Sequence, residues 1–168
     1  STLSTPFAGA PKVKITEFAY GGKIAAAKGD GEYTEITNLG VTAADLTGWS
    51  YDTSATVTTP GALSLSSLGL LMPGESALIT DVTPAELRTD WGLRDSVKVI
   101  ADNGTTLNKG PMTIRLYDNG NTLVDSVAYA SGFLSGKGIA AWVDAAHVGQ
   151  KAGTTGWTIA TSADAEAS

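Results

Sequence analysis

The stretch GEYTEITNLGVTAADLTGW, residues 31–49, decides which fold this chain adopts. Its first part, 33–38 (YTEITN), is rich in β-branched and aromatic side chains, which favour a strand. Asn38 and Gly40 then allow the backbone to turn, because Asn forms local hydrogen bonds and Gly tolerates dihedral angles that other residues avoid. The pattern therefore predicts a strand that ends in a turn.

The second part of the stretch predicts another strand, over 46–52 (LTGWSYD). Leu46 and Trp49 supply large apolar anchors, and a buried Trp needs a hydrogen-bond partner for its indole N–H. Gly48 between them allows another backbone or a ring to approach closely. The whole stretch thus indicates strand, turn and strand, and it contains no catalytic signature.

Alternation of apolar and polar residues predicts further short strands on both sides of this stretch. The expected strands cover 12–18, 33–38, 46–52, a segment around 62–65, 76–80, 97–101, 112–117, 122–129, 139–143 and 157–159. Asp-Asn-Gly joins the segments 112–117 and 122–129, and this is a strong hairpin signal. About eight to ten short strands with turn signals between them predict an all-β, antiparallel sandwich or barrel.

One short helix is predicted over 84–91. Thr83 can cap it, Pro84 takes the first helical position, Glu86 takes the capping-box position, and Gly92 ends it. The helix is too short to organise a fold, so we expect it to cross from one sheet to the other.

Composition limits the classes of function. The 168 residues suit one domain, and the absence of cysteine excludes disulfides, zinc–thiolate sites and a cysteine nucleophile. The net charge of -6 predicts repulsion of phosphate backbones and of anionic membranes, so we expect no nucleic-acid partner. No apolar run approaches the roughly 20 residues that a membrane span needs.

These segments together resemble the lamin tail domain family, whose members adopt an immunoglobulin-like fold. The resemblance covers about 12–143 and extends toward Trp157. It is carried by short motifs in a fixed order, whose residues here are Ile15, Glu17, Glu32, Tyr33, Glu35, Ile36, Asn38, Asp45, Leu46, Gly48, Trp49, Pro73, Gly74, Trp91, Gly92, Leu93, Asp125 and Tyr129. It implies an immunoglobulin-like antiparallel β-sandwich over 12–160, preceded by a linker at 1–11 and followed by a flexible tail at 161–168.

The resemblance also implies a role. Bacterial members of the family are often joined to secreted nucleases, phosphatases or other hydrolases. We therefore expect a non-catalytic module of a larger bacterial secreted or cell-surface protein, which recognises or positions an unknown protein or a polysaccharide. Other domains of the same polypeptide and an extracellular location follow from the same resemblance.

Aromatic residues suggest a carbohydrate-binding module as an alternative function. Core packing is the default for each Trp and Tyr of the chain. Tyr20 lies beside Gly21 and Gly22, and Trp157 lies near the tail, so we expect these two rings to be the most exposed and to form the ligand-binding candidates.

Glu17, Glu35 and Asp45 are the candidates for a metal site, because paired carboxylates can bind calcium or perform hydrolysis. A small metal-dependent hydrolase is thus a further alternative, although hydrogen bonding to loops or to solvent is the simpler role for these residues. Apart from calcium at this site, we expect no cofactor. The Asp-Asn-Gly sequences at 102–104 and 118–120 are read as turns. His147 is the only histidine and has no Gly-x-Ser-x-Gly motif beside it, so we expect no catalytic residue.

Overall fold

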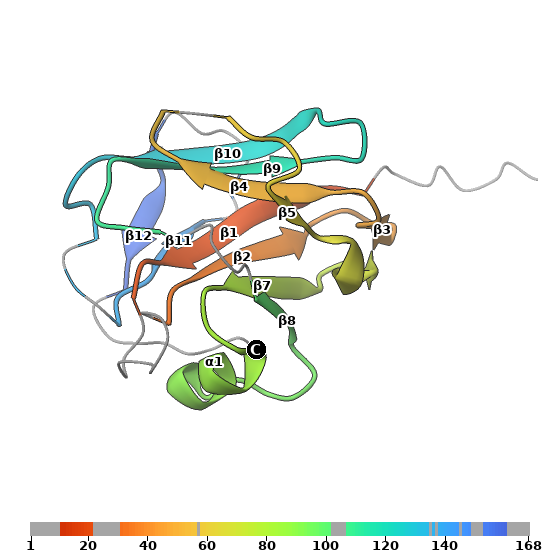
Figure 1. The fold of residues 1–168 in the computed structure, drawn as a ribbon, viewed down its shortest axis with the longest axis horizontal. Coiled ribbons are helices and arrows are strands. Elements are labelled where there is room, and N and C mark those ends of the chain that lie inside the picture. The colour runs from red at the N-terminus through yellow and green to blue at the C-terminus, as the bar shows by residue number, and fades with distance from the viewer. Residues whose placement is uncertain are drawn as a thin grey trace, which may run out of the picture.

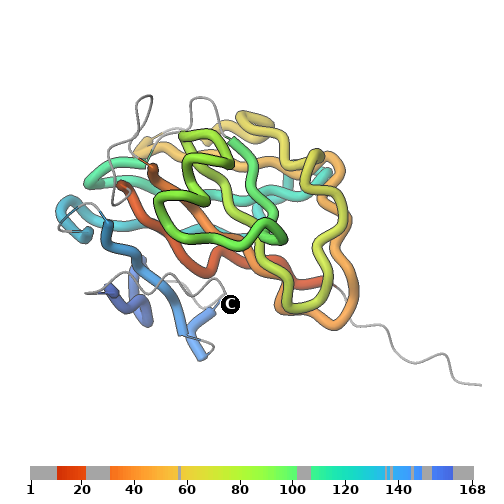
Figure 2. Tube along the Cα trace, turned by 90° about the horizontal axis from the view of Figure 1, so that it is seen from below, coloured from red at the N-terminus to blue at the C-terminus, as the bar shows by residue number. Residues whose placement is uncertain are grey.

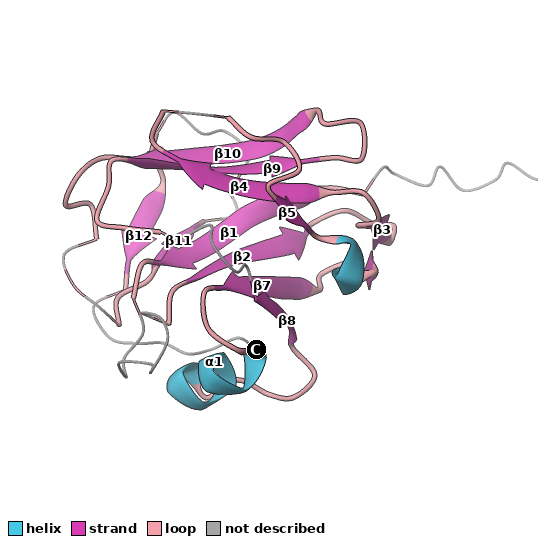
Figure 3. Cartoon of the chain, in the orientation of Figure 1, coloured by secondary structure: helices cyan, strands magenta, loops and turns pink. Residues whose placement is uncertain are grey.

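The described residues form a sandwich of two β-sheets with an α-helix beneath it (Figures 1 and 3). The computed structural model describes residues 11–21, 31–56, 58–101, 107–134, 136, 138–144, 146–148 and 153–160. All but the last residue of the expected linker at 1–11, the tail at 161–168 and the turn at 102–104 lie outside these residues, so the domain boundaries stay a prediction. Within the described part of the chain, none of the helices is long and apolar enough to cross a membrane.

The larger sheet has six strands in the order β12-β11-β1-β2-β7-β8. Their bounds are β1 Val13–Ala19, β2 Tyr33–Asn38, β7 Ser76–Thr80, β8 Lys98–Ala101, β11 Ala141–Val143 and β12 Trp157–Ile159. All neighbours are antiparallel except β7 and β8. The strands β1 and β2, which contain the motif residues Ile15, Tyr33 and Ile36, lie in the middle of the larger sheet.

The smaller sheet has four strands in the order β10-β9-β4-β5, and a separate two-stranded ribbon joins β3 to β6. The bounds are β4 Ser50–Ser54, β5 Leu63–Ser64, β9 Met112–Tyr117 and β10 Leu123–Tyr129, with β3 Ala44–Asp45 and β6 Leu70–Leu71 in the ribbon. A 3₁₀ helix, η1, spans Ser66–Leu68. The expected hairpin of β9 and β10 is confirmed.

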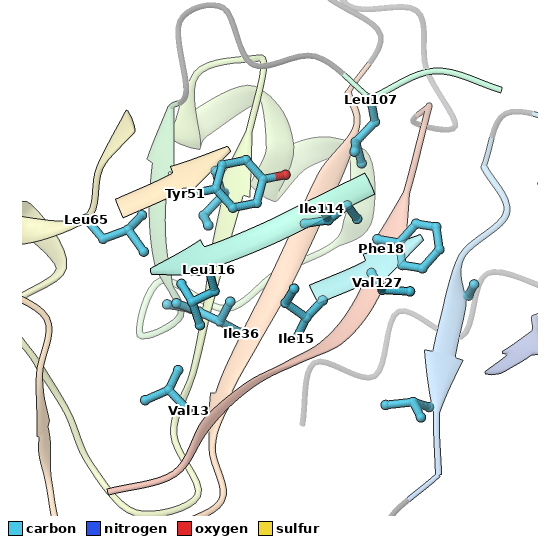
Figure 4. Packing of buried hydrophobic residues seen from close by; sticks show 14 of the residues in the cluster. Val13, Ile15, Phe18, Ile36, Tyr51, Leu65, Leu107, Ile114, Leu116 and Val127 are labelled. Atoms are coloured by element: carbon cyan, nitrogen blue, oxygen red, sulfur yellow. The ribbon is translucent and has the colours of Figure 1, made fainter. Parts of the chain in front are cut away.

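The core lies between the two sheets. Side chains of both inner faces interdigitate there, with Ile15 and Ile36 from the larger sheet near Ile114 and Leu116 from the smaller one (Figure 4). Phe18 of β1 stacks on Tyr129 of β10, with ring centroids 5.0 Å apart. The alternation read from the sequence therefore places the apolar side of each strand inward, as a sandwich requires.

One carboxylate joins the two sheets where β1 bulges. The register of β1 against β2 shifts between Ile15 and Glu17, so Thr16 is an extra residue on β1. The backbone N–H of Ile15 donates to Oδ2 of the buried Asp125 on β10 at 2.8 Å. Asp125 thus satisfies a buried backbone donor across the sandwich.

Helix α1, Pro84–Trp91, has the bounds and the capping box that the sequence predicts. The expectation that it crosses between sheets is wrong. It connects β7 to β8, which are parallel neighbours in the same sheet, and a parallel pair needs such a crossover. Leu87 and Trp91 pack beneath the larger sheet in a second, smaller core with Tyr33 and Leu78.

The expectation of a strand over 46–52 is also partly wrong, because β4 begins at Ser50. Leu46 and Trp49 instead close a turn, in which the Trp49 N–H donates to the Leu46 carbonyl at 3.0 Å. Gly48 at φ +77 permits this turn. Leu46 is nevertheless fully buried and Trp49 packs against the core, so both act as the anchors that the sequence predicts.

Candidate functional site

Glu17 and Glu35 lie directly opposite each other on the neighbouring strands β1 and β2. Opposed residues of an antiparallel pair share one face, with Cβ atoms about 4.5–5.5 Å apart. The neighbours Phe18 and Ile36 belong to the core, so the two carboxylates lie on the outer face of the larger sheet, the face that α1 covers at one end. The structure thus brings together two of the three predicted metal ligands.

Hydroxyl groups of β1 and β2 surround this pair. Tyr33 Oη donates to Glu17 Oε1, and Thr16 Oγ1 donates to Glu35 Oε1. Thr37 Oγ1 also donates to Glu35 Oε1, at 3.3 Å. Each carboxylate therefore has neutral donors, which stabilise a negative charge less than a cation would.

The environment favours the protonated form of both acids. Burial raises the pKa of Glu17 to about 7; the repulsion from Glu35 adds to this rise, whereas the hydrogen bond from Tyr33 opposes it. Burial also raises the pKa of Glu35, and hydrogen bonds from Thr16, Thr37 and Ser76 oppose that rise. Burial and the nearby Glu17 raise the pKa of Tyr33. A half-buried pair of like charges is unfavourable at neutral pH unless something neutralises it.

The described cations of the same sheet donate elsewhere. Lys14 Nζ donates to the Val124 carbonyl at 3.1 Å, and Lys98 Nζ lies 3.1 Å from Glu75 Oε1. Arg115 of the smaller sheet pairs with Asp52 at 3.4 Å. In the part of the chain that the structure describes, no ion pair therefore neutralises Glu17 or Glu35.

A partly exposed tryptophan extends this site across the sheet. Trp142 of β11 is directly opposite Glu17 on the other side of β1, and 41% of its surface is exposed. Its neighbours Ala141 and Val143 are buried in the core, so alternation directs Trp142 to the outer face. Glu35, Glu17 and Trp142 form a row across β2, β1 and β11, which we call the Glu35–Glu17–Trp142 row.

The sequence did not single out Trp142, although a signal was present. In the segment AWV, the indole lies between two small or β-branched residues, and only one face of a strand at this position can meet the core. Which residue of the three points outward becomes known only when β11 pairs with β1.

Figure 2 views the outer face, where the green trace of α1 lies in front of the orange β2 while the blue β11 and β12 lie at the lower left.

Asp45 does not join the other two metal candidates. It is exposed on β3, where its Oδ1 accepts the Thr47 N–H at 2.9 Å, and the hydrogen bonds with Thr47 lower the pKa of Asp45. The described residues contain no group of three or more His, Cys, Asp or Glu side chains that could hold a metal. The three-carboxylate site is thus not assembled, and calcium binding stays a prediction that rests on Glu17 and Glu35.

Tyr20 and Trp157 are core residues, so the expectation that they are the most exposed rings is wrong. Their exposed fractions are 6% and 9%, and the Trp157 ring packs 5.0 Å from that of Phe18. The glycines and the tail near them in the sequence gave no information about burial. A ligand-binding role of either residue stays a prediction, and Trp142 presents the aromatic surface that they lack.

The remaining candidates form local structure. His147 Nδ1 lies 2.8 Å from Asp144 Oδ1, and this bond lowers the pKa of Asp144. Both side chains lie within one turn after β11, at positions i and i+3. Asp118 Oδ1 accepts the N–H groups of Gly120 and Thr122, which confirms that 118–120 forms a turn.

The comparisons with known proteins agree with this architecture. The family model of the lamin tail domain matches residues 6–131, which is most of the chain and contains both carboxylates, whereas Trp142 lies outside the matched part. No curated protein matches the chain. The family is an immunoglobulin-like, non-catalytic domain family, in agreement with the sandwich. The signature strands, the capped helix and the closing hairpin are therefore those of a known module: this chain belongs to the lamin tail domain family.

Proposed function

We propose that this lamin tail domain is a non-catalytic recognition module of a larger bacterial secreted or cell-surface protein, and that it binds its partner through the outer face of the larger sheet. The observation that carries the proposal is the exposed Trp142 beside the carboxylate of Glu17 on adjacent strands. Aromatic rings with neighbouring polar groups on a rigid sheet are typical of recognition surfaces.

The wider context of the proposal comes from the family. Its bacterial members accompany secreted nucleases, phosphatases and other hydrolases, and a chain without cysteine and with few charges is compatible with such a setting. In this arrangement, the catalytic chemistry belongs to a neighbouring domain, and the present domain positions that enzyme on a protein or polysaccharide target.

The second candidate function is carbohydrate binding. Trp142 favours it, because an exposed indole on a sheet can stack on a sugar ring while carboxylates accept hydrogen bonds from its hydroxyls. A metal-dependent hydrolase has less support, since Asp45 lies apart from Glu17 and Glu35 and exposed on another strand.

A thermal melt of the 168-residue chain tests the proposed function. The ligands are a panel of soluble polysaccharides and cationic peptides, each with calcium and with EDTA. A ligand at 100 times its Kd stabilises the fold by about 2.7 kcal/mol, so we expect at least one clear rise in Tm. Trp142→Ala should reduce that rise. Leu123→Ala is the matched control, because Leu123 is an exposed apolar residue of the smaller sheet.

The same preparation tests the hydrolase alternative with chromogenic glycosides and phosphodiesters. Calcium-dependent turnover that disappears in Glu35→Gln, with the fold intact, would contradict the non-catalytic role. A panel that shifts Tm equally in the Trp142→Ala protein would show that the outer face is not the binding surface.

A further inference from the structure

The Glu35–Glu17–Trp142 row combines two features that a cationic side chain requires. The carboxylates of Glu17 and Glu35 are half-buried, and among the described residues their hydrogen-bond donors are neutral hydroxyls and no cation pairs with them. Carboxylates bind guanidinium and ammonium groups through charge-assisted hydrogen bonds. The two carboxylates therefore provide the anionic part of a binding site for a cationic side chain.

The indole of Trp142 supplies the other part. The faces of aromatic rings attract cations, and Trp does so most strongly. Neighbouring strands lie about 4.8 Å apart, so the three positions of the row span about 10 Å, which is within reach of one long side chain. The direct pairings Glu35 to Glu17 and Glu17 to Trp142 place all three residues on one face.

We propose that the Glu35–Glu17–Trp142 row is a docking site for an arginine or lysine side chain of a partner protein. The cation lies between the carboxylates and the indole. The inference rests on the proposed recognition function and specifies the chemistry of the partner. Charge complementarity supports it, since the chain carries a net charge of -6.

A cation explains the site better than the other occupants do. A neutral sugar would supply no charge, so the two opposed acids would avoid like-charge repulsion only by staying protonated, whereas a cation stabilises them as carboxylates. A divalent metal prefers six or more oxygen ligands, whereas the described residues assemble no group of three acidic or histidine side chains. A guanidinium group can stack on Trp142 and bind a carboxylate with two parallel hydrogen bonds, so arginine fits the row best.

The test is an NMR titration of the isotopically labelled 168-residue chain, in which the indole N–H signal of Trp142 is followed. The probe is a capped Gly-Arg repeat peptide, and its control is the same peptide with citrulline, which keeps the shape of arginine without its charge. We expect the arginine peptide to shift the Trp142 signal and the citrulline peptide to bind at least about tenfold more weakly. Raising the NaCl concentration from 50 to 500 mM should weaken the arginine peptide further.

Variants locate the binding. Glu17→Gln and Glu35→Gln should each lower the affinity for the arginine peptide about tenfold or more, and Trp142→Ala should lower it about 2- to 30-fold. Asp95→Asn removes the same amount of charge from an exposed residue that follows α1, so it should leave the affinity unchanged. Equal binding of the citrulline peptide, or equal losses in Asp95→Asn and Glu17→Gln, would overturn the inference.

The polysaccharide panel separates this inference from the proposed function. If a polysaccharide binds and requires Trp142 while the arginine peptide does not bind, the cation inference fails and the recognition function stands. If neither the arginine peptide nor any ligand of the panel binds, both fail.

Discussion

The surroundings of Glu17 disfavour the charged form of its carboxyl group. Burial raises its pKa to about 7, from an ordinary value of 4.5, and Glu35 on the next strand adds to the rise. Tyr33 provides a hydrogen bond but no compensating charge. Residues that lower stability in this way are typical of binding surfaces, where a ligand supplies the missing interaction.

We predict that Glu17→Gln raises the free energy of unfolding at pH 8 by about 1–3 kcal/mol and leaves it nearly unchanged at pH 4.5. The folded state binds the proton of Glu17 more tightly than the unfolded state, so wild-type stability falls as pH rises from about 4.5 to about 7. Gln lacks this titration but can still accept the Tyr33 hydrogen bond. Urea denaturation of both proteins at several pH values measures the difference, and a difference that is constant with pH would contradict the prediction.

Gly48 is required for two reasons that substitution can separate. Its φ of +77 is unfavourable for other residues, and a Cβ atom here would lie 3.0 Å from Cβ of Asn119 in the β9–β10 turn. We predict that Gly48→Ala lowers the free energy of unfolding by about 2–3 kcal/mol, from backbone strain and from the close contact. Gly61 is the control, because its φ is +86 but no atom lies within 4 Å of the Cβ position. Equal losses in Gly48→Ala and Gly61→Ala would show that the contact has no effect.

At the scale of elements, Asn38 joins the end of β2 to the β3–β6 ribbon. Its Nδ2 donates to the Leu71 and Thr42 carbonyls, both at 2.8 Å, and its Oδ1 accepts the Gly40 N–H at 3.0 Å. The side chain is fully buried. One amide thus replaces the sheet hydrogen bonds that two-residue strands cannot form.

We predict that Asn38→Ala lowers the free energy of unfolding by about 2–4 kcal/mol, because it removes the amide donor from the buried bond to the Leu71 carbonyl. Asn38→Asp separates the two functions of the amide, since it keeps the acceptor for Gly40 but removes both donors. We expect it to be at least as destabilising at pH 7. Chemical denaturation measures both variants. A loss below about 0.5 kcal/mol in Asn38→Ala would mean that water replaces the amide.

Across the whole molecule, an aromatic group holds the two sheets together. Phe18 of β1 stacks on Tyr129 of β10 and packs against Trp157 of β12, with ring centroids 5.0 Å apart in each case. The Tyr129 hydroxyl donates to the Asn108 carbonyl at 2.8 Å, and burial raises the pKa of Tyr129. The contact between the two sheets in this region therefore depends on strands that are far apart in the sequence.

We predict that Phe18→Ala lowers the free energy of unfolding by about 3–5 kcal/mol, because it removes the ring at the centre of this group and leaves a cavity. Near-ultraviolet circular dichroism and urea denaturation measure the effect. Phe133→Ala is the comparison, since Phe133 is only partly buried beside the same cluster and its ring centroid is 6.2 Å from that of Phe18. An equal loss in both variants would contradict the central position of Phe18.

The sequence by itself determined the strands β1, β2, β7, β9 and β10 to within a residue at most, the helix with its cap, and the hairpin turn. These features follow from side chains within a few residues of one another, through alternation, capping and turn chemistry. The ribbon of β3 and β6 was not predicted, because two-residue strands carry no local signal. The start of β4 was misplaced, because large apolar residues such as Leu46 and Trp49 can be buried from a turn as readily as from a strand.

The tertiary structure alone decided the candidate site. Glu17 and Glu35 were both candidates, but their opposition depends on the register of β1 against β2 and on the bulge at Thr16. Trp142 joins them from more than a hundred residues away, whereas Tyr20, Trp157 and Asp45 are placed elsewhere. The reason is physical: strand register follows from burying one face of each strand against distant partners, and a shift by one residue would turn every one of these side chains to the opposite face.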